Sequence, residues 1–380
     1  MPGIDGTIGV GVIGTGFMGK AHAMAYRAAP AIFPLARRPV LELVADNDAA
    51  GAERAHRAFG FRRLTTDWRA LVADPAVAIV CITTPTALHR EMALAALAAG
   101  KHVHCEKPLA LDGAGTAELA RAAEQAAAAG IRTQVGFNYL KNPLLGRARD
   151  MIAAGELGEI TNFRGIHAEG YMADPEAPWS WRLDPAGAGV IADLGSHIIA
   201  LARFLLGPIA ELVADLETVV KERPAAPGSA ERRAVAVDDI ARLTVRFARG
   251  CGGTIEASWV ATGRTMQLGF EVTGTRGALS FSQERLNELL LYRADAGRAA
   301  TNGFVRIEAG PEHPPYGLFC PAPGHQLGFN DLKTIEVADF LGAIAGGPVN
   351  GPDFREAAEI QKVVDAALRS SRERSWHAIG

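Results

Sequence analysis

The sequence predicts an α/β protein of two domains: a doubly wound parallel sheet, followed by an α+β domain with an open, mainly antiparallel, mixed sheet. Three observations lead to this prediction. The chain has 380 residues, more than one hydrophobic core usually organises. Its first third alternates strand-like and helix-like segments, and strand-like runs dominate the remainder. We therefore expect domains at residues 1–135 and 136–380.

The first domain is predicted from strict alternation. Short apolar runs are each followed by a helical segment, and two of the helices end at Gly100 and Gly130, residues typical of a helix stop. Such alternation indicates parallel strands joined by helical crossovers. The expected strands are residues 7–14, 40–46, 76–84, 101–107 and 132–137, and the expected helices are residues 22–29, 47–59, 87–100 and 116–130.

The second domain is predicted from successive strand-like runs separated by turn residues, a pattern typical of an antiparallel sheet. Helical segments are expected beside this sheet, and two proline-rich stretches are expected to be surface loops, the second long enough to approach a site. The strand-like runs are residues 158–171, 210–222, 238–250, 251–261, 266–282 and 288–295. The helices are residues 189–207, 331–347 and 353–371, and the loops are residues 221–234 and 309–329.

Composition and charge exclude several classes of function. The formal net charge of -3 gives no electrostatic reason to expect nucleic acid or an anionic membrane, so we expect a small-molecule ligand. The four cysteines are far apart and form no C-x-x-C pair, which argues against a disulfide framework or a zinc knuckle. No apolar run is long enough for a membrane span, and the first residues lack the basic region of a signal peptide. We expect a cytoplasmic protein.

A glycine motif lies near the start of the chain. In residues 9–23, GVGVIGTGFMGKAHA, Gly14, Gly16 and Gly19 form G-x-G-x-x-G between an expected strand and an expected helix. There the first glycine permits a tight turn, the second lets the backbone approach a pyrophosphate, and the third lets helix and strand pack closely. The helix N-terminus adds N–H groups and a partial positive charge. The motif therefore predicts a Rossmann dinucleotide-binding domain rather than a tight turn alone.

The second expected strand ends in VADND, which places Asp46 where a carboxylate accepts hydrogen bonds from the adenosine ribose. A carboxylate there repels a 2′-phosphate, so NAD is favoured over NADP. Arg37 and Arg38 leave the other choice open, because a cation near the ribose would suit a 2′-phosphate. Surface charge is the simpler interpretation of these two arginines.

Two segments carry titratable side chains suited to proton transfer. Lys107 follows an expected strand in CEKPLA, at the edge of the sheet where such folds bind ligands, although a solvated lysine is the more frequent case. Asp193 and His197, in GVIADLGSHIIAL, are four residues apart and share one face of an expected helix. A carboxylate beside an imidazole can orient it as a general base, and an ordinary helix ion pair is the alternative.

Four motifs occur in a fixed order: GVIGTGFMGKAHA, EKP at 106–108, GFNYLKNP at 136–143 and DLGSH at 193–197. In this combination the whole chain resembles the Gfo/Idh/MocA oxidoreductase family. The resemblance implies a C-terminal sheet that carries the substrate site and mediates a homodimer or homotetramer. It also implies hydride transfer between NAD(P) and a secondary hydroxyl of a sugar, anhydrosugar or cyclitol. By motif position, Lys107 would contact the substrate oxygen and the nicotinamide, Asp193 would hold substrate or base, and His197 would be the acid/base.

The remaining site residues are expected around these motifs. Aromatic faces and hydrogen-bonding groups suit polyhydroxylated rings, and residues 171–185 supply Tyr171, Trp179, Trp181 and Arg182. The family often has arginine after the aromatic residue of GFNY, where this chain has Leu140 and then Lys141. The expected cofactor residues are Gly14, Gly16, Phe17, Met18, Gly19, Asp46, Thr84, Pro85, His89, Glu106 and Lys107. The expected substrate residues are Lys107, Asn138, Tyr139, Trp179, Arg182, Asp193, His197 and His325.

Three alternatives accompany this prediction. A metal site is conceivable because His102 and His104 share a strand face beside Cys105, but metal ligands normally come from several segments, so we predict none. A glycosidase that uses NAD for transient oxidation would need the same Lys107 and His197. A non-catalytic dinucleotide sensor would bind NAD without turnover, and the intact set of proton-transfer residues argues against it.

Overall fold

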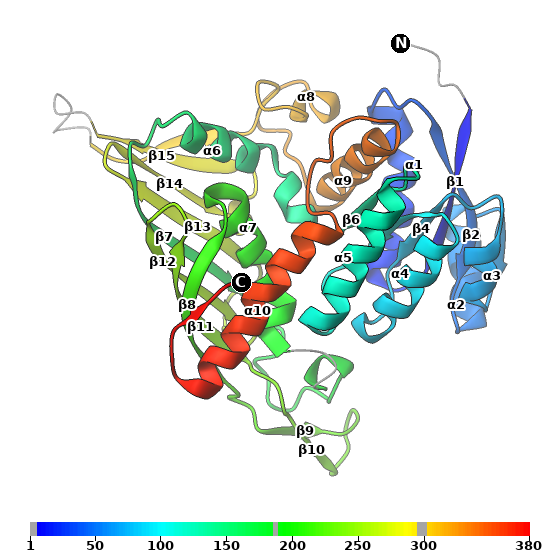
Figure 1. Ribbon diagram of the computed structural model, residues 1–380, viewed down its shortest axis with the longest axis horizontal. Helices are drawn as coiled ribbons and strands as arrows, with labels where there is room; N and C mark the ends of the chain where they lie inside the picture. Colours follow the sequence, from blue (N-terminus) through cyan, green and yellow to red (C-terminus); the bar gives the residue numbers. More distant parts are fainter. Residues whose placement is uncertain (1–5, 185–188, 295–301) are drawn as a thin grey trace. The chain divides into compact units, whose positions relative to one another are not determined.

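A computed structural model describes residues 6–184, 189–294 and 302–380, which form two compact units (Figure 1). The first unit comprises residues 1–141 and 328–359, and the second comprises residues 142–327 and 360–380. The expected boundary near residue 135 lies close to the first crossing between units. The return of residues 328–359 to the first unit was not expected, because we assigned them to the C-terminal domain.

The first unit contains a six-stranded parallel sheet in the order β3-β2-β1-β4-β5-β6, which confirms the predicted doubly wound fold. Its central strands are apolar throughout because both faces are covered by helices. The strands are β1 (Thr7–Ile13), β2 (Arg38–Ala45), β3 (Arg63–Thr65), β4 (Ile79–Ile82), β5 (His102–Cys105) and β6 (Thr133–Val135).

The helices of this unit form two groups, one containing α1, α2 and α9 and the other containing α3, α4 and α5. Several begin at a side-chain cap: the carboxylates of Asp48, Asp67 and Asp112 each accept a backbone N–H of the first turn. The helices are α1 (Phe17–Ile32), α2 (Ala49–Phe59), α3 (Trp68–Ala73), α4 (His89–Ala98), α5 (Gly113–Ala127) and α9 (Phe329–Ile344), with 3-10 turns η1 (Thr86–Leu88) and η2 (Asn138–Lys141).

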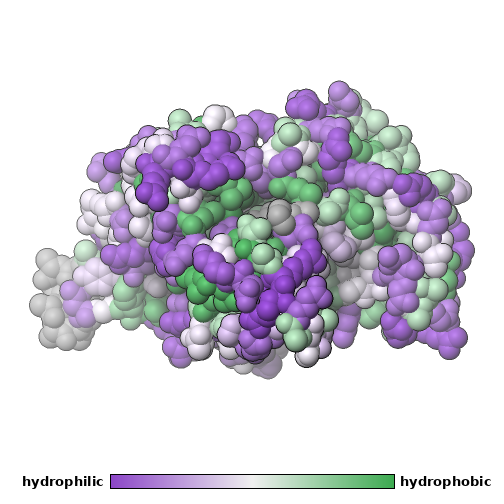
Figure 2. Space-filling view, turned by 90° about the horizontal axis from the view of Figure 1, so that it is seen from below, coloured by the Kyte–Doolittle hydropathy of each residue, from purple (hydrophilic) through white to green (hydrophobic). Residues whose placement is uncertain are grey.

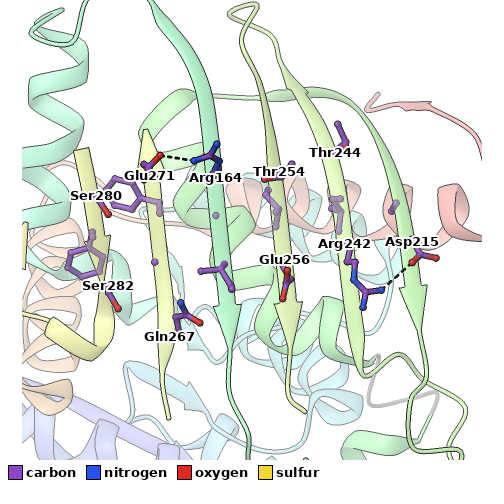
Figure 3. Close-up of a pocket in the computed structure, with 18 of the residues that line it drawn as sticks. Arg164, Asp215, Arg242, Thr244, Thr254, Glu256, Gln267, Glu271, Ser280 and Ser282 are labelled. Atoms are coloured by element: carbon purple, nitrogen blue, oxygen red, sulfur yellow. Dashed lines mark hydrogen bonds and ion pairs between the residues drawn. The ribbon is translucent and has the colours of Figure 1, made fainter. Parts of the chain in front are cut away.

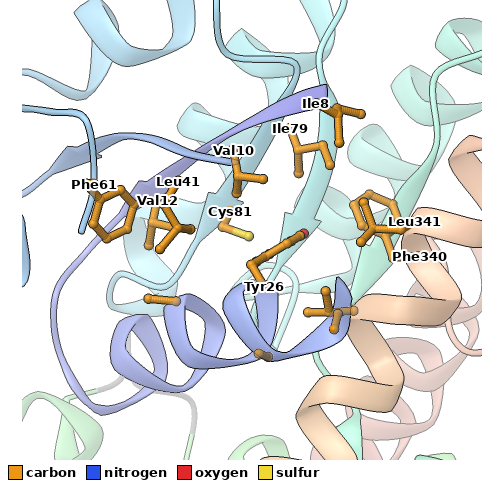
Figure 4. Packing of buried hydrophobic residues seen from close by; sticks show 14 of the residues in the cluster. Ile8, Val10, Val12, Tyr26, Leu41, Phe61, Ile79, Cys81, Phe340 and Leu341 are labelled. Atoms are coloured by element: carbon orange, nitrogen blue, oxygen red, sulfur yellow. The ribbon is translucent and has the colours of Figure 1, made fainter. Parts of the chain in front are cut away.

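Helix α9 completes the core of the first unit. Figure 4 shows Phe340 and Leu341 of α9 beside Tyr26 of α1 and the strand residues Val10 and Ile79, and all five are buried. The sequence predicted this helix, expected at residues 331–347 and observed at Phe329–Ile344. Periodicity does not identify the surface against which a helix packs, which is why its assignment to the second domain was wrong.

The second unit contains a nine-stranded mixed sheet in the order β16-β15-β14-β13-β7-β12-β11-β8-β17. Strands β7 and β12 are parallel, and the other neighbours are antiparallel, as the sequence predicted. The strands are β7 (Ile160–Ala168), β8 (Ile209–Glu217), β11 (Ile240–Phe247), β12 (Gly252–Ser258), β13 (Gln267–Gly274), β14 (Gly277–Ser282), β15 (Glu288–Arg293), β16 (Val305–Glu308) and β17 (His377–Ala378). A separate hairpin joins β9 (Glu222–Pro224) to β10 (Arg232–Ala234).

One face of this sheet is covered by helix. Gly165 of β7 makes this possible, since a Cβ there would lie 2.8 Å from Ile198 of α7. The expected helix at residues 189–207 contains a π-helical turn, η5 (Ile191–Gly195), which continues directly into α7 (Ser196–Leu206). The other helices are α6 (Pro143–Ala153), α8 (Tyr316–Phe319) and α10 (Phe354–Glu373), with short 3-10 turns η3 (Trp181–Leu183) and η6 (Gln283–Arg285).

Hydrophilic side chains cover much of the face seen in Figure 2, with hydrophobic ones between them. Within residues 6–184, 189–294 and 302–380, every helix is too short or too polar to cross a bilayer.

Candidate active site

The glycine loop joins β1 to α1 and has the geometry that the motif predicts. Gly14 has φ +98°, and its N–H donates to the carbonyl of Ala45 at the end of β2. A Cβ on Gly19 would lie 2.1 Å from the Gly14 carbonyl oxygen, so only glycine allows α1 to start so close to the loop. A Cβ on Gly16 would meet nothing within 4 Å. The open space beside Gly16 and the absence of a side-chain cap on α1 fit a phosphate-binding turn.

Asp46 follows β2 and is tied to the same loop. Its Oδ2 accepts hydrogen bonds from the backbone N–H of Thr15 at 2.8 Å and from the Thr15 hydroxyl at 2.6 Å. Arg38 begins β2 at its other end, about 25 Å away for an eight-residue strand, and the Arg37 guanidinium donates to the carbonyl of Thr7. The two arginines therefore lie at the opposite edge of the sheet from Asp46 and do not share its site.

His89 lies between the loops that follow β4 and β5. Its Nδ1 is 2.8 Å from the Pro108 carbonyl oxygen, and its Nε2 is 2.8 Å from the Thr84 carbonyl oxygen. The ring is buried, and burial lowers the pKa of His89. His89 thus connects the Thr84–Pro85 loop to the EKP loop. Phe17, by contrast, is 69% exposed at the start of α1, and its ring lies 5.5 Å from that of Phe329.

Lys107 is half-buried after the carboxyl end of β5, as predicted. The neighbouring Glu106 points into the interior, where its Oε1 lies 2.7 Å from Nε2 of His22 and 2.9 Å from Nζ of Lys333. Burial opposes charge on Glu106, but Lys333 and His22 hold its pKa well below the ordinary value. Oε1 of Glu106 therefore has two partners inside the first unit, and the Glu106 backbone N–H donates to the Ile82 carbonyl at 2.9 Å.

The network around Glu106 extends through α9. Nζ of Lys333 lies 2.5 Å from Oε2 of Glu336, and that oxygen lies 3.3 Å from Nε2 of His104. The network contains five ionisable side chains, and all are buried: His22, His104, Glu106, Lys333 and Glu336. A single ammonium group thus lies between two carboxylates inside the first unit. No local sequence pattern revealed this network, because Lys333 and Glu106 are separated by 227 residues.

The residues considered for a metal site, His102, His104 and Cys105, do not form one ligand group in the structure. His102 accepts the Arg132 N–H, and Nδ1 of His104 lies 3.3 Å from the Tyr26 hydroxyl. Ligand atoms of His22, Cys81 and His104 lie within 4.8 Å of one another. Burial raises the pKa of Cys81 to about 12, and burial together with Lys333 lowers the pKa of His22 to about 4. These three side chains are fully buried in the packed core of the first unit, and the expectation of no metal site stays a prediction.

In the second unit, Asp193 is bound by two residues predicted from the aromatic segment. Its Oδ2 accepts from the Tyr171 hydroxyl at 3.2 Å and from Nε of Arg182 at 3.3 Å. Burial and the Asp193 carboxylate raise the pKa of Tyr171. The Arg182 guanidinium also lies 4.7 Å from the ring centre of Trp181, which is 41% exposed. Tyr171, Trp181 and Arg182 therefore lie together at the carboxylate of Asp193.

His197 is buried in the first turn of α7, and a histidine that the sequence analysis missed lies beside it. The ring of His167, on β7, has its centre 5.5 Å from that of His197. Nδ1 of His167 lies 2.9 Å from the Leu194 carbonyl oxygen, and its Nε2 lies 3.1 Å from Oε1 of Glu169. His167 lies in the strand-like run predicted at residues 158–171, but it was given no role, because nothing in the local pattern indicated its partner.

The other expected substrate residues lie in different settings. Trp179 donates its backbone N–H to Pro224 of the β9–β10 hairpin, and its ring lies 3.4 Å below the Arg233 guanidinium. His325 is exposed, with Nδ1 3.2 Å from the Ala322 carbonyl oxygen of its own loop. These contacts of Trp179 and His325 are made with residues other than Asp193.

Asn138 and Tyr139 belong to η2 of the first unit. Asn138 is buried, and its Nδ2 has no hydrogen-bond partner among the described residues. The Tyr139 ring contacts that of Phe329 at 6.0 Å. Lys141, the second residue after Tyr139, is buried. Its Nζ donates to Asp339 at 2.6 Å and to the Asn350 carbonyl.

Comparison with known proteins agrees with these features. Residues 8–137 match the oxidoreductase family with the NAD-binding Rossmann fold, and residues 145–280 match the GFO/IDH/MocA C-terminal domain. Levoglucosan dehydrogenase from Pseudarthrobacter phenanthrenivorans is 38% identical over 97% of each chain. Inositol 2-dehydrogenase from Rhizobium meliloti is 28% identical over 97% of this chain and 98% of the relative.

Solved structures of a levoglucosan dehydrogenase are similar over nearly the whole chain. The complex with NADH and levoglucosan superposes with a TM-score of 0.93 at 38% identity, covering 99% of this chain and 100% of the other. The complex with NADH and L-sorbose gives a TM-score of 0.94 at 37% identity with the same coverage.

Proposed function

Because the chain belongs to the Gfo/Idh/MocA family of NAD-binding oxidoreductases, we propose that it transfers a hydride between NAD and a secondary ring hydroxyl of an anhydrosugar or related sugar. The end-to-end similarity to levoglucosan dehydrogenase carries this choice of substrate class. The surroundings of Asp193 also support this substrate class. Asp193 lies four residues before His197 and is bound by Tyr171 and Arg182, which together form a polar and aromatic surface of the kind that binds sugar rings.

The cofactor would be held by the first unit. The turn at Gly14–Gly19 and the N-terminus of α1 would bind the pyrophosphate, and Asp46 would accept the ribose hydroxyls. When bound, NAD supplies the carbon that accepts the hydride. Asn138, whose buried amide N–H groups await an acceptor, is proposed to donate to cofactor or substrate.

The protein's own residues would handle the proton and the developing charge. As the C–H hydride leaves, the substrate O–H proton passes to His197, and the C–O bond becomes a carbonyl. Lys107 stabilises the oxygen while it carries negative charge. Asp193 orients the substrate or the imidazole. The products are the keto sugar, the reduced cofactor and one proton, and reduction uses the same groups in reverse.

Turnover assays test this proposal. The purified protein is incubated with NAD or NADP and with levoglucosan, L-sorbose, myo-inositol or scyllo-inositol, and the absorbance of the reduced nicotinamide is followed. We expect reduction of NAD with levoglucosan at a higher kcat/KM than with either inositol. Preference for an inositol would replace the substrate class. Binding of NAD without turnover of any polyol would favour a sensor, and cleavage of glycosides without net NADH would favour a glycosidase.

We also propose a homodimer or homotetramer in the cytoplasm, formed through the uncovered face of the nine-stranded sheet. Figure 3 shows this face, where Arg164 pairs with Glu271 and Arg242 pairs with Asp215. A hollow of about 810 Å³ lies among these pairs, and Ile166 and Phe270 are among the residues that line it. A face on which charged pairs lie beside apolar side chains is suited to pack against the same face of a second copy of the chain. Light scattering after size-exclusion chromatography tests this, and a monomer at micromolar concentration contradicts it.

A further inference from the structure

The π-helical turn η5 is held at its start by Asp238, which lies just before β11. Oδ2 of Asp238 accepts the Ile191 N–H at 2.8 Å, and its backbone carbonyl accepts the Val190 N–H at 3.0 Å. Gly189 has φ +72°, and a Cβ there would lie 2.1 Å from Oδ1 of Asp238. The close approach of Asp238 to the turn therefore depends on glycine at residue 189.

The other end of η5 is held by His167 of β7. Nδ1 of His167 lies 2.9 Å from the Leu194 carbonyl oxygen, and Glu169 fixes the far side of the ring at 3.1 Å. His167 is 1% exposed, so water does not compete for this bond. Both ends of the turn Ile191–Gly195 are thus hydrogen-bonded to residues of the sheet unit. Asp238 accepts an N–H at the start of the turn, and His167 donates to a carbonyl near its end.

These ties matter because of the geometry of the turn. A π-helical turn inside a helix is rare in proteins and occurs frequently at functional sites. Asp193 lies in the middle of η5, and His197 follows in the first turn of α7. Any relaxation of η5 to α-helical geometry would rotate Asp193 away from Tyr171 and Arg182.

We propose that Asp238 and His167 are positioning residues for the reaction, which hold η5 in the π-helical form that presents Asp193 and His197. Neither residue is proposed to touch substrate. The catalytic roles of Asp193 and His197 rest on the proposed function. The hydrogen bonds by which Asp238 and His167 hold η5 do not depend on it.

Steady-state kinetics with levoglucosan and NAD provide the first test. Asp238→Ala removes the acceptor, and we expect kcat to fall by about a hundredfold, the effect of displacing a catalytic group by about 1 Å, with KM for NAD nearly unchanged. Asp238→Asn keeps an acceptor oxygen and should recover most of the activity. His167→Phe should behave like Asp238→Ala, and His167→Asn, which keeps an N–H near the position of Nδ1, should be intermediate.

A matched control separates positioning from stability. Ser370, also buried in the second unit, accepts the Ala214 N–H at 2.9 Å and donates to the Ser375 carbonyl, remote from η5. Ser370→Ala should lower the unfolding midpoint and leave kcat unchanged. If Asp238→Ala lowers kcat no more than Ser370→Ala does, the proposal is wrong.

Hydrogen exchange gives a readout independent of turnover. In Asp238→Ala and His167→Phe, the amides of residues 189–197 should exchange at least about tenfold faster than in wild type, and those of Ser370→Ala should not. Equal exchange in all three variants would overturn the proposal. If wild-type protein turns over no sugar but the exchange pattern is as expected, the proposed function fails and the fixing of η5 stands.

Discussion

The two units present their proposed catalytic groups in opposite ways. In the first unit, the residue beside Lys107 belongs to a dry network of full charges, in which Lys333 pairs with Glu106 and Glu336. In the second unit, the turn that carries Asp193 is fixed mainly by bonds to its backbone, and its ion pair with Arg182 is open to solvent on the arginine side.

This difference has an energetic meaning. Breaking a buried ion pair leaves a charge without a partner, so the cofactor side of the protein tolerates little change. A pair with an exposed arginine is worth much less, so residues around Asp193 can vary at small cost. We infer that the first unit is constrained by its charges, while the second unit can adapt its substrate contacts around a fixed turn.

The largest effects are expected when the proposed chemical groups themselves are removed. Lys107→Ala and His197→Ala should each lower kcat by about 10²- to 10⁴-fold, because each is proposed to act in the transition state. NAD affinity, measured by fluorescence titration, should change little. Wild-type turnover in both variants would refute the proposed catalytic roles of Lys107 in the first unit and His197 in the second.

Loss of the buried cation should be the next largest effect. Lys333→Met leaves Glu106 and Glu336 without their ammonium partner and should reduce the free energy of unfolding by about 3–5 kcal/mol, measured with denaturant. The double variant Lys333→Met/Glu106→Gln should recover part of this loss. Lys221→Met, at an exposed lysine, serves as the control and should change stability by less than about 0.5 kcal/mol. Equal effects of the two lysine substitutions would show that the network contributes no stability.

The second unit should respond to pH through Asp238. Burial raises the pKa of Asp238 from 3.8 to about 7, with the neighbouring Asp239 adding to the shift and the Ile191 and Val190 N–H groups opposing it. The folded state therefore holds this proton more tightly than the unfolded state. Its contribution to stability is complete below about pH 4 and is lost as the pH rises through 7, by up to about 4 kcal/mol.

Denaturant unfolding at several pH values between these limits measures this effect. Asp238→Asn cannot titrate and should show a flatter dependence of unfolding free energy on pH than wild type. Identical slopes for the two proteins would mean that Asp238 does not titrate in this range.

The smallest effect is expected at the ribose site. Asp46→Ala removes the carboxylate that disfavours a 2′-phosphate and should reduce the preference for NAD over NADP by about tenfold, as the ratio of kcat/KM values. Asp48→Ala, which removes the cap of α2 nearby, is the control for local disturbance. An unchanged preference in Asp46→Ala would show that this carboxylate does not reach the ribose.

Much of the fold was predictable because it depends on local patterns. The alternation of strands and helices, the glycines at 14, 16 and 19, and the cap at Asp48 all arise from neighbours in the chain. The position of Lys107 after a parallel strand followed from the same pattern. Tyr171 and Arg182 were identified as site residues from their chemistry, and the structure brings them to Asp193.

What escaped prediction depends on distant partners. The buried pairing of Glu106 with Lys333 was not predicted, because Lys333 is on a helix whose packing surface no local pattern reveals. His167 and Asp238 were missed because alternation along a strand gives the side of the sheet and not the contact. The π-helical turn has the same apolar residues as an α-helix, so periodicity does not distinguish the two.

The return of α9 also limits how this gene can be cut. A fragment that stops at residue 141 would lack Lys333, leaving Glu106 with no ammonium group, and would bare the apolar surface that Phe340 and Leu341 cover. Residues 1–141 alone are therefore not expected to fold as a stable dinucleotide-binding domain. A fusion or transplant that borrows it must also carry residues 328–359.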